Sequence, residues 1–553
     1  MKASPRPDLV TRGLFALALA LPFVAAVAHA GLVDDGAHDA AILRGLGLAA
    51  SRWPTPDGVL AAPFIALPVG TLVFRLALPS AVSAALASAA LFALARRVAA
   101  RVIGDETPRL VAAVATFAAL ATTLGRPWQV EATGPLGATI GAAAALGAMA
   151  WVAREADAPD ASWRTRLRLD GLAGRMLPVL AASLALVVIF ALRRAHGGPP
   201  VAEPTAWTWI FDRARVTSFV MRDVGAVTTL LAALGLGVAL IAARSRWVGA
   251  GLALAGAVAA AFVGWGANVG PERFSAFALV VAAVVQSFAG LGLTWVVRRV
   301  ARLRLPLATA SAAMVALLGA AFPAIAYDEA TFAREAKSAL ERVDWGRAIV
   351  GDAPDGALVV LEDRRATERL VAAGLIGELP TFLEIVPLDD IGGPMVRAAL
   401  ARTPSLVPLV RDVTLTGLPT EVALSNLAAD HAVHLVYNAR FERALARHLV
   451  PAGALDRFEP EPRGVADRKR GVELAEEALA PVITATREAD ARAMGGSTAA
   501  LLGARAEGFA TIHDRELGAR TVATMQAFAP GEARIAALEA RFRGGKGREA
   551  SRR

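Results

Sequence analysis

The sequence predicts a multi-pass α-helical membrane protein with a water-facing C-terminal α/β domain and a helical tail. Three observations support this fold class. The 553 residues are 55% hydrophobic, with a mean hydropathy of +0.49, which is too apolar for an ordinary soluble protein. Charged residues make up only 19% of the chain and gather in a few short runs and in its last two-fifths. After residue 356 the hydrophobic pattern changes from long apolar segments to short strands that alternate with helices.

Residues 1–327 form the predicted membrane domain. A helix that crosses the hydrocarbon needs about 20 apolar residues, somewhat fewer with polar flanks. We therefore expect about nine spans by this hydropathy criterion. They lie at 13–30, 76–95, 110–124, 136–152, 176–192, 224–243, 248–267, 275–297 and 305–326.

Two apolar segments near the N-terminus, 13–30 and 59–74, are open to more than one interpretation. Ala28-His29-Ala30 has the small-x-small form of a signal-peptide cleavage site. We interpret residues 13–30 as an uncleaved span, because many further spans follow and the acidic loop behind it needs tethering. The apolar stretch 59–74 is short and contains two prolines and a glycine, which favours an interfacial or re-entrant piece.

Arginine-rich turns alternate with arginine-poor turns along this domain. The basic turns are 96–101, 164–175, 244–246 and 298–304, whereas 125–134 and 269–274 are arginine-poor loops. By the positive-inside rule, this bias places the N-terminus inside and residues after Tyr327 outside the cytoplasmic membrane. There are two exceptions: the segment 193–222 is basic although it is placed outside, and the turn 244–246 is very short. The net charge of +9 comes almost entirely from arginine, much of it in short loops between apolar segments, so a nucleic-acid partner is the weaker explanation.

Residues 328–464 are predicted to form an extracytoplasmic α/β domain. Short β-branched runs suit strands at 356–362, 382–388, 408–415 and 432–438. Helical patterns follow them at 364–376, 393–401, 420–428 and 439–449. This alternation predicts a parallel sheet covered by helices. His431 and His434 would point to opposite faces of a strand, so ordinary histidines are favoured over zinc ligands.

Residues 465–553 are rich in Ala, Glu and Arg at helical spacing and end in a basic tail, 544–553. We expect a few helices packed as hairpins, serving as a structural or partner-binding cap. The chain has no cysteine, which excludes disulfides, thiolate catalysis and cysteine-bound metal. We assign no metal site and no cofactor.

A polar cluster follows the first span. Asp34 and Asp35 lie just outside it, where a carboxylate is available as a general base. Three arginines at predicted outer-surface positions suit a lipid phosphate, because a guanidinium offers a bidentate fork, and two tryptophans suit stacking on a sugar. These residues are Arg52, Arg75 and Arg126, with Trp53 and Trp128. The alternatives are a solvated, topology-setting loop, independent snorkelling of the arginines and an aromatic belt.

The order of motifs resembles a known family. Asp34-Asp35-Gly36-Ala37 leads into Leu46-Gly47-Leu48 and Leu67-Pro68-Val69-Gly70…Arg75. This run resembles a bacterial family of multi-pass proteins of unknown function that is related to protein O-mannosyltransferases, within the GT-C glycosyltransferase superfamily. Its pattern is Asp-Ser-Gly-Glu, Leu-Gly-Val, His-Pro-Pro-Gly and Leu-Pro-x-Gly…Arg. The resemblance spans nearly the whole chain at low identity.

The resemblance implies an inner-membrane enzyme with a GT-C-like fold. Such an enzyme transfers sugar from a polyprenyl-phosphate-linked donor to a protein or glycan acceptor outside the membrane, with Asp34 in the acidic motif. Ala37 replaces the motif Glu, and Trp53-Pro54-Thr55-Pro56 replaces His-Pro-Pro-Gly, which implies slow, altered or lost activity. The alternative is a non-catalytic envelope protein that binds a partner. A transporter ranks last, because the predicted spans contain almost no internal charges.

Overall fold

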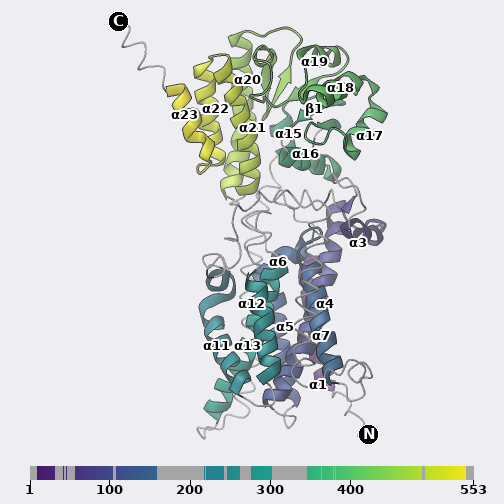
Figure 1. The fold of residues 1–553 in the computed structure, drawn as a ribbon, viewed down its shortest axis with the longest axis vertical. Coiled ribbons are helices and arrows are strands. Elements are labelled where there is room, and N and C mark those ends of the chain that lie inside the picture. The colour runs from purple at the N-terminus through teal and green to yellow at the C-terminus, as the bar shows by residue number, and fades with distance from the viewer. Residues whose placement is uncertain are drawn as a thin grey trace. The chain divides into compact units, whose positions relative to one another are not determined.

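The computed structural model describes residues 9–30, 56–103, 108–157, 219–241, 246–261, 276–301 and 345–543, apart from 363, 378, 380 and 489–491, together with the single positions 42, 45, 46 and 217. These residues divide into two compact units (Figure 1). The helical unit ends at Ala301, and the C-terminal unit begins at Trp345. Each unit is considered by itself below.

The helical unit is built from nine described α-helices and one π-helical turn. They are α1 (Leu9–Ala28), α3 (Pro56–Ile65), α4 (Leu72–Ile103), α5 (Pro108–Thr123), α6 (Arg126–Thr133), α7 (Thr139–Asp157), η2 (Val220–Gly225), α11 (Ala226–Ile241), α12 (Arg246–Ala261) and α13 (Ala276–Ala301). Seven of the predicted apolar segments coincide with helices among them. The segments 176–192 and 305–326 lie outside the described residues.

Four described helices are long and apolar enough to cross a membrane. They are Leu9–Ala28, Leu72–Val102, Asp223–Ile241 and Ala276–Val296, and the bent pair α5–α6 would make a fifth. These helices fit the expected helical membrane protein, whereas the total of about nine crossings stays a prediction. The stretch 59–74 is not one helix. It divides into α3, a turn through Gly70 with φ +59°, and the start of α4.

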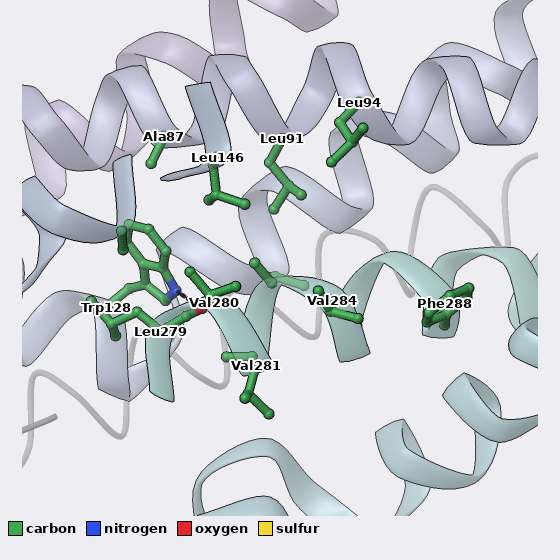
Figure 2. Packing of buried hydrophobic residues seen from close by; sticks show 14 of the residues in the cluster. Ala87, Leu91, Leu94, Trp128, Leu146, Leu279, Val280, Val281, Val284 and Phe288 are labelled. Carbon is green, nitrogen blue, oxygen red and sulfur yellow. Dashed lines mark hydrogen bonds between the residues drawn. The ribbon is translucent and has the colours of Figure 1, made fainter. Parts of the chain in front are cut away.

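The core of the helical unit surrounds α13, of whose apolar segment 89% is buried. Figure 2 shows Leu279, Val280 and Val284 of α13 facing α4 and Trp128 of α6. α11 approaches α13 through two glycines, Gly235 and Gly292. A Cβ on Gly235 would lie 1.8 Å from the Phe288 carbonyl oxygen. Small residues therefore set this contact, as expected where helices pack in a membrane.

The C-terminal unit contains one five-stranded mixed sheet. Its strands are β1 (Ala357–Leu361), β2 (Leu383–Pro387), β3 (Val433–Leu435), β4 (Leu449–Ala452) and β5 (Leu455–Phe458), in the order β2-β1-β3-β5-β4. β2, β1 and β3 are parallel, and the β4–β5 hairpin adds two antiparallel strands. Three of the four predicted strands are confirmed, but the prediction of an all-parallel sheet is wrong.

Two further predictions in this unit are wrong. Residues 408–415 belong to a helix, α18 (Val407–Thr416), whose buried Leu409 and Val413 are spaced by one helical turn. Residues 439–449 form turns and a 3₁₀ segment, η5 (Leu445–His448), before β4 begins. The predicted helices α16 (Arg364–Ile376), α17 (Pro394–Arg402) and α19 (Glu421–Ala428) are confirmed.

Helices cover both faces of the sheet. Side chains such as Val359 and Leu361 pack with α16, whereas Leu358 and Val360 pack with α17, α18 and α19. The C-terminal helices are α20 (Val465–Glu488), α21 (Arg492–Thr511), α22 (Arg515–Phe528) and α23 (Ala533–Arg543), and they share the α16-side core. The predicted α/β domain and helical tail therefore form one unit.

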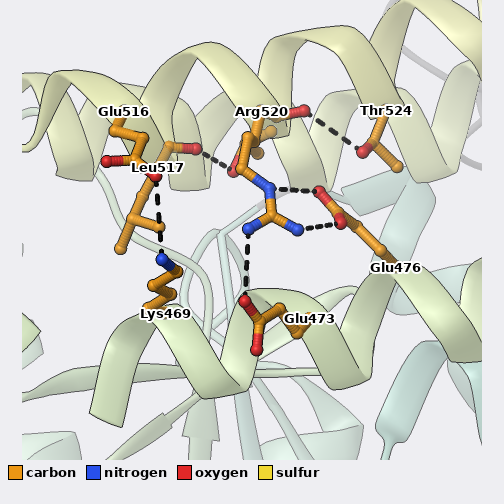
Figure 3. Close-up of polar contacts among 8 residues, drawn as sticks. Lys469, Glu473, Glu476, Glu516, Leu517, Arg520 and Thr524 are labelled. Carbon is orange, nitrogen blue, oxygen red and sulfur yellow. Dashed lines mark hydrogen bonds and ion pairs between the residues drawn. The ribbon is translucent and has the colours of Figure 1, made fainter. Parts of the chain in front are cut away.

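Salt bridges also join the C-terminal helices. Arg520 of α22 binds Glu476 through Nε (3.3 Å) and Nη2, and its Nη1 lies 3.5 Å from Glu473, so that α22 is attached to α20 (Figure 3). Lys469 and Glu516 add a longer contact of 4.0 Å. The basic tail 544–553 lies outside the described residues.

Candidate functional site at the break between α5 and α6

The helix α6 follows α5 at an angle of 59°. Leu124 and Gly125 form the break, and Pro127 lies in the first turn of α6, where its missing N–H costs nothing. The arginine-poor segment 125–134 was predicted to be a loop on the outer side, and the prediction of a loop is wrong. The segment is a helix whose residues are mostly buried, because its polar side chains find partners inside the unit.

Two side chains, Trp128 and Gln129, attach α6 to neighbouring helices. The indole Nε1 of Trp128 donates to the Leu279 carbonyl of α13 at 3.2 Å (Figure 2). Gln129 Nε2 donates to the Thr123 carbonyl at 2.6 Å, which bridges the break to α5. Trp128 is fully buried, so its contacts here are those of a packing residue.

Glu131 is a buried carboxylate that sequence reasoning missed. Its side chain is only 2% exposed, and Oε2 accepts a hydrogen bond from the Ala138 amide at 2.8 Å. Its only signal in the sequence is one acid among apolar and small residues, inside the segment 125–134 that was predicted to be a loop. An ionisable group inside a membrane domain is costly to bury and commonly functional.

The backbone beside Glu131 is tightly constrained. Leu136 has φ +47°, a left-handed conformation that is strained for a branched side chain. Its amide donates to the Leu76 carbonyl of α4 at 3.2 Å, and the Gly137 amide donates to Ser80 Oγ at 2.7 Å. A Cβ on Gly137 would lie 2.0 Å from the Glu131 carbonyl oxygen. Strain of this kind is found most often at functional sites.

An ion pair links α6 to η2. Arg126 Nη1 lies 3.6 Å from Asp223 Oδ1, with side chains that are 29% and 11% exposed. The π-helical turn η2 ends at Gly225, which has φ +93° and is followed directly by α11. Such π turns inside helices frequently mark functional sites. The Nε of Arg126 is buried and makes no hydrogen bond within the described structure.

Arg75 of α4 stabilises the turn that precedes its own helix. Its Nη1 donates to the Ile65 and Leu67 carbonyls at 2.7 and 3.1 Å, which closes the turn between α3 and α4. α4 contacts both α3 and α6. Arg75 and Arg126 therefore belong to elements that meet at one end of the helical unit (Figure 1).

The other predicted site residues, Asp34, Asp35, Arg52 and Trp53, lie outside the described residues. The convergence of Arg52, Arg75 and Arg126 stays a prediction.

The chain matches no known protein-family model, and no curated protein matches it either. The family resemblance therefore depends on the motifs quoted from the sequence, and the site has to be interpreted from its own geometry.

Proposed function

We propose that the protein is a membrane glycosyltransferase of the GT-C type. It would transfer a sugar from a polyprenyl-phosphate-linked donor to a protein or glycan acceptor outside the bacterial inner membrane. The observation that carries the proposal is the buried polar site at the α5–α6 break. There a carboxylate, Glu131, and an ion pair, Arg126–Asp223, are held inside a domain that is otherwise apolar.

The chemistry needs a base and a cation. A carboxylate takes the proton from the acceptor hydroxyl, whose oxygen then attacks the anomeric carbon. The bond between that carbon and the phosphate oxygen breaks, and the lipid phosphate leaves with the electron pair. A guanidinium stabilises the departing phosphate. Asp34 is the proposed base, and Arg126 is the proposed cation at the α6 end of the domain.

Glu131 has a different proposed role. Its described contact is with the Ala138 backbone amide rather than with an open face of the unit. We therefore assign Glu131 a positioning function, in which the carboxylate fixes the turn between α6 and α7. The α6–α7 turn then orients α6, the helix that carries Arg126.

The distribution of arginines supports the proposed orientation. α5 ends beside α6, and α7 begins just after it, so the start of α5 and the end of α7 lie away from the break. The arginines at that opposite end are Arg97, Arg101, Arg109 and Arg154. A basic end faces the cytoplasm by the positive-inside rule, which leaves the α6 site at the outer surface, where lipid-linked donors are consumed.

A non-catalytic envelope protein is the second candidate. The C-terminal unit exposes large apolar side chains on α18 and α19, among them Val407, Leu415 and Val422, and apolar exposure of this kind often serves protein contacts. Ala37 in the place of the motif Glu also favours this candidate.

The test uses the full chain in lipid nanodiscs. A panel of radiolabelled hexosyl-phosphate-polyprenols is offered as donors, with peptides and glycans of the cell envelope as acceptors. The parent chain should transfer label, and Asp34→Asn should lose transfer while it still folds and inserts. Asp35→Asn is the matched control, because the related motif has Ser there. Transfer at the parental rate by Asp34→Asn would remove Asp34 from the mechanism.

The two candidate functions predict different results in cells. Mass spectrometry of envelope glycans with and without the gene should reveal a lost modification if the protein is a transferase. An envelope protein that only binds a partner would leave the glycans unchanged, and the Asp34→Asn chain would still capture that partner.

A further inference from the structure

Arg126 uses little of its hydrogen-bonding capacity. A guanidinium carries five N–H donors, but the described contact of Arg126 is one ion pair with Asp223 at 3.6 Å. Charge-assisted hydrogen bonds between such groups are about 2.7–2.9 Å long. The Nε of Arg126 is buried and lacks a hydrogen-bond acceptor. The pair is therefore loose, and Arg126 has donors for a second anion.

Asp223 depends on an unusual backbone turn for its position. It lies within the π-helical turn η2, which Gly225 ends with φ +93°. A π turn holds one more residue than an α-helical turn. Conversion of η2 to regular α-helix would rotate the side chain of Asp223 by about 100° relative to α11. The contact of Asp223 with Arg126 therefore depends on the π-helical turn.

We infer that the Arg126–Asp223 ion pair is exchangeable, and that a phosphate group replaces Asp223 on Arg126 when it binds. The choice of a lipid-borne phosphate rests on the proposed function. The carboxylate of Asp223 occupies the position of the anion in the resting protein. A bound phosphate could accept from two N–H groups of the guanidinium at once, whereas the described contact with Asp223 joins one nitrogen and one oxygen at 3.6 Å.

This arrangement makes Asp223 a competitor of the ligand. Removal of the Asp223 charge should free Arg126 and strengthen phosphate binding. If the salt bridge were purely structural, the same change would leave phosphate binding unchanged or weaken it. The direction of the change at Asp223 is therefore the distinguishing result.

The experiment measures binding by native mass spectrometry of the full chain in nanodiscs. The three probes are polyprenyl phosphate, the same polyprenol without phosphate, and inorganic phosphate. Asp223→Asn should bind polyprenyl phosphate about fivefold more tightly, at the lower end of typical coupling between sites. Arg126→Gln should bind it about tenfold or more weakly. Asp223→Glu keeps the charge and should behave as the parent does.

A double variant tests whether the two residues act as one unit. Arg126→Gln/Asp223→Asn should bind as weakly as Arg126→Gln, because the gain from Asp223→Asn requires Arg126. Arg109→Gln, at the opposite end of α5, is the matched control and should bind as the parent does. Thermal unfolding of each variant in the same nanodiscs identifies any that fail to fold.

Several results would overturn the inference. These are equal or weaker binding by Asp223→Asn, a gain that persists without Arg126, and equal binding of the polyprenol that lacks phosphate. Competition by inorganic phosphate with the same variant pattern would support the exchange and identify phosphate itself as the ligand. Binding is measured without turnover, so a protein with no transferase activity can still pass this test.

Discussion

Arg505 of α21 donates a hydrogen bond from Nε to Oδ1 of Asp456 in β5 at 2.6 Å, and both side chains are buried. Its Nη2 donates to the carbonyls of Gly453 (3.0 Å) and Leu455 at the β4–β5 turn. Burial raises the pKa of the Asp456 carboxyl, and the charge of Arg505 opposes that shift. This one guanidinium therefore attaches the C-terminal helices to the hairpin edge of the sheet.

Arg505→Met should destabilise the C-terminal unit by about 3–5 kcal/mol, because it leaves Asp456 buried without its partner. Asp456→Leu in the same chain should restore much of that loss, since a buried pair can be replaced by apolar residues at little cost. Hydrogen exchange of the β4–β5 amides in the full chain measures both effects. Arg411→Met, at an exposed arginine of α18, is the control. Equal protection in Arg505→Met and the parent would contradict the role assigned to this pair.

Acid should weaken the C-terminal unit through His434. The imidazole of His434 in β3 is fully buried, and neither ring nitrogen has a hydrogen-bond partner in the described structure. Burial lowers its pKa from 6.5 to about 4, Asp352 opposes the shift and Arg457 adds to it. Between these two pH values the unfolded chain binds a proton that the folded chain excludes. Stability is therefore complete above pH 6.5 and falls as the pH drops toward 4, by about 3 kcal/mol.

The measurement is the difference between parent and His434→Leu in chemical unfolding from pH 7.5 to 4. Subtracting the unfolding free energy of one chain from that of the other cancels the pH dependence that Asp456 contributes to both. His431→Gln is the matched control, because His431 is only half-buried and Nε2 lies 3.1 Å from Ser405 Oγ. Parallel pH profiles for the parent and His434→Leu would show that His434 does not titrate on unfolding.

The hydrophobic pattern of the sequence predicted those strands and helices of the C-terminal unit whose hydrophobic periodicity is unambiguous. β1, β2 and α16 follow from continuous apolar runs and one amphipathic helix. α18 was missed because its Val, Leu and Thr content favours a strand, although the four-residue spacing of Leu409 and Val413 favours a helix. The β4–β5 hairpin was missed because its signal is a single glycine, Gly453 at φ +61°, inside a short apolar stretch.

The site was harder to predict than the fold. Position along the chain identified Arg126 as a residue near one membrane surface, but its partner Asp223 is 97 positions away. A contact between residues so far apart in the chain does not affect the hydrophobic periodicity of either segment, so a single sequence does not reveal it. Glu131 illustrates the same difficulty, because only the fold reveals that its carboxylate is buried beside Ala138.

Substitutions of Glu131 separate positioning from charge. Glu131→Gln keeps an oxygen that accepts from the Ala138 amide, whereas Glu131→Ala leaves that buried N–H without this acceptor, at a cost of about 1–3 kcal/mol. We expect Glu131→Ala to lower the melting temperature of the purified protein clearly more than Glu131→Gln does. If the two variants are equally destabilised, the carboxylate charge rather than this hydrogen bond is what the α6–α7 turn requires.

The contact between α11 and α13 offers a clean test of the helical packing. Gly235→Val should strongly destabilise the helical unit, because even a Cβ there would lie 1.8 Å from the Phe288 carbonyl oxygen. Gly237→Val is a matched control on the same helix, since a Cβ at Gly237 has nothing within 4 Å. Thermal unfolding in detergent compares the two. Equal melting temperatures would mean that the helices do not approach at Gly235.

The last prediction concerns topology: the N-terminus lies inside and the residues after Tyr327 lie outside. Basic turns alternate with arginine-poor turns along the sequence, and the last basic run, 298–304, precedes one more apolar segment, 305–326. That segment would carry the chain outward. An error of one span would reverse this result, and the weakest candidate is 59–74, which the structure divides between α3 and α4. If it were a full crossing, Arg96, Arg97 and Arg101 would lie outside.

A reporter fused after Ala330 tests the topology. Alkaline phosphatase should be active there, and a reporter that works only in the cytoplasm should give no signal. A second fusion after Arg101 is the control and should give the opposite pattern, because α4 is long and apolar enough to cross the membrane and the predicted topology places its C-terminal end inside. Active phosphatase after Arg101 and none after Ala330 would invert the whole domain. The α6 site would then face the cytoplasm, where a donor carried on the outer leaflet could not reach Arg126.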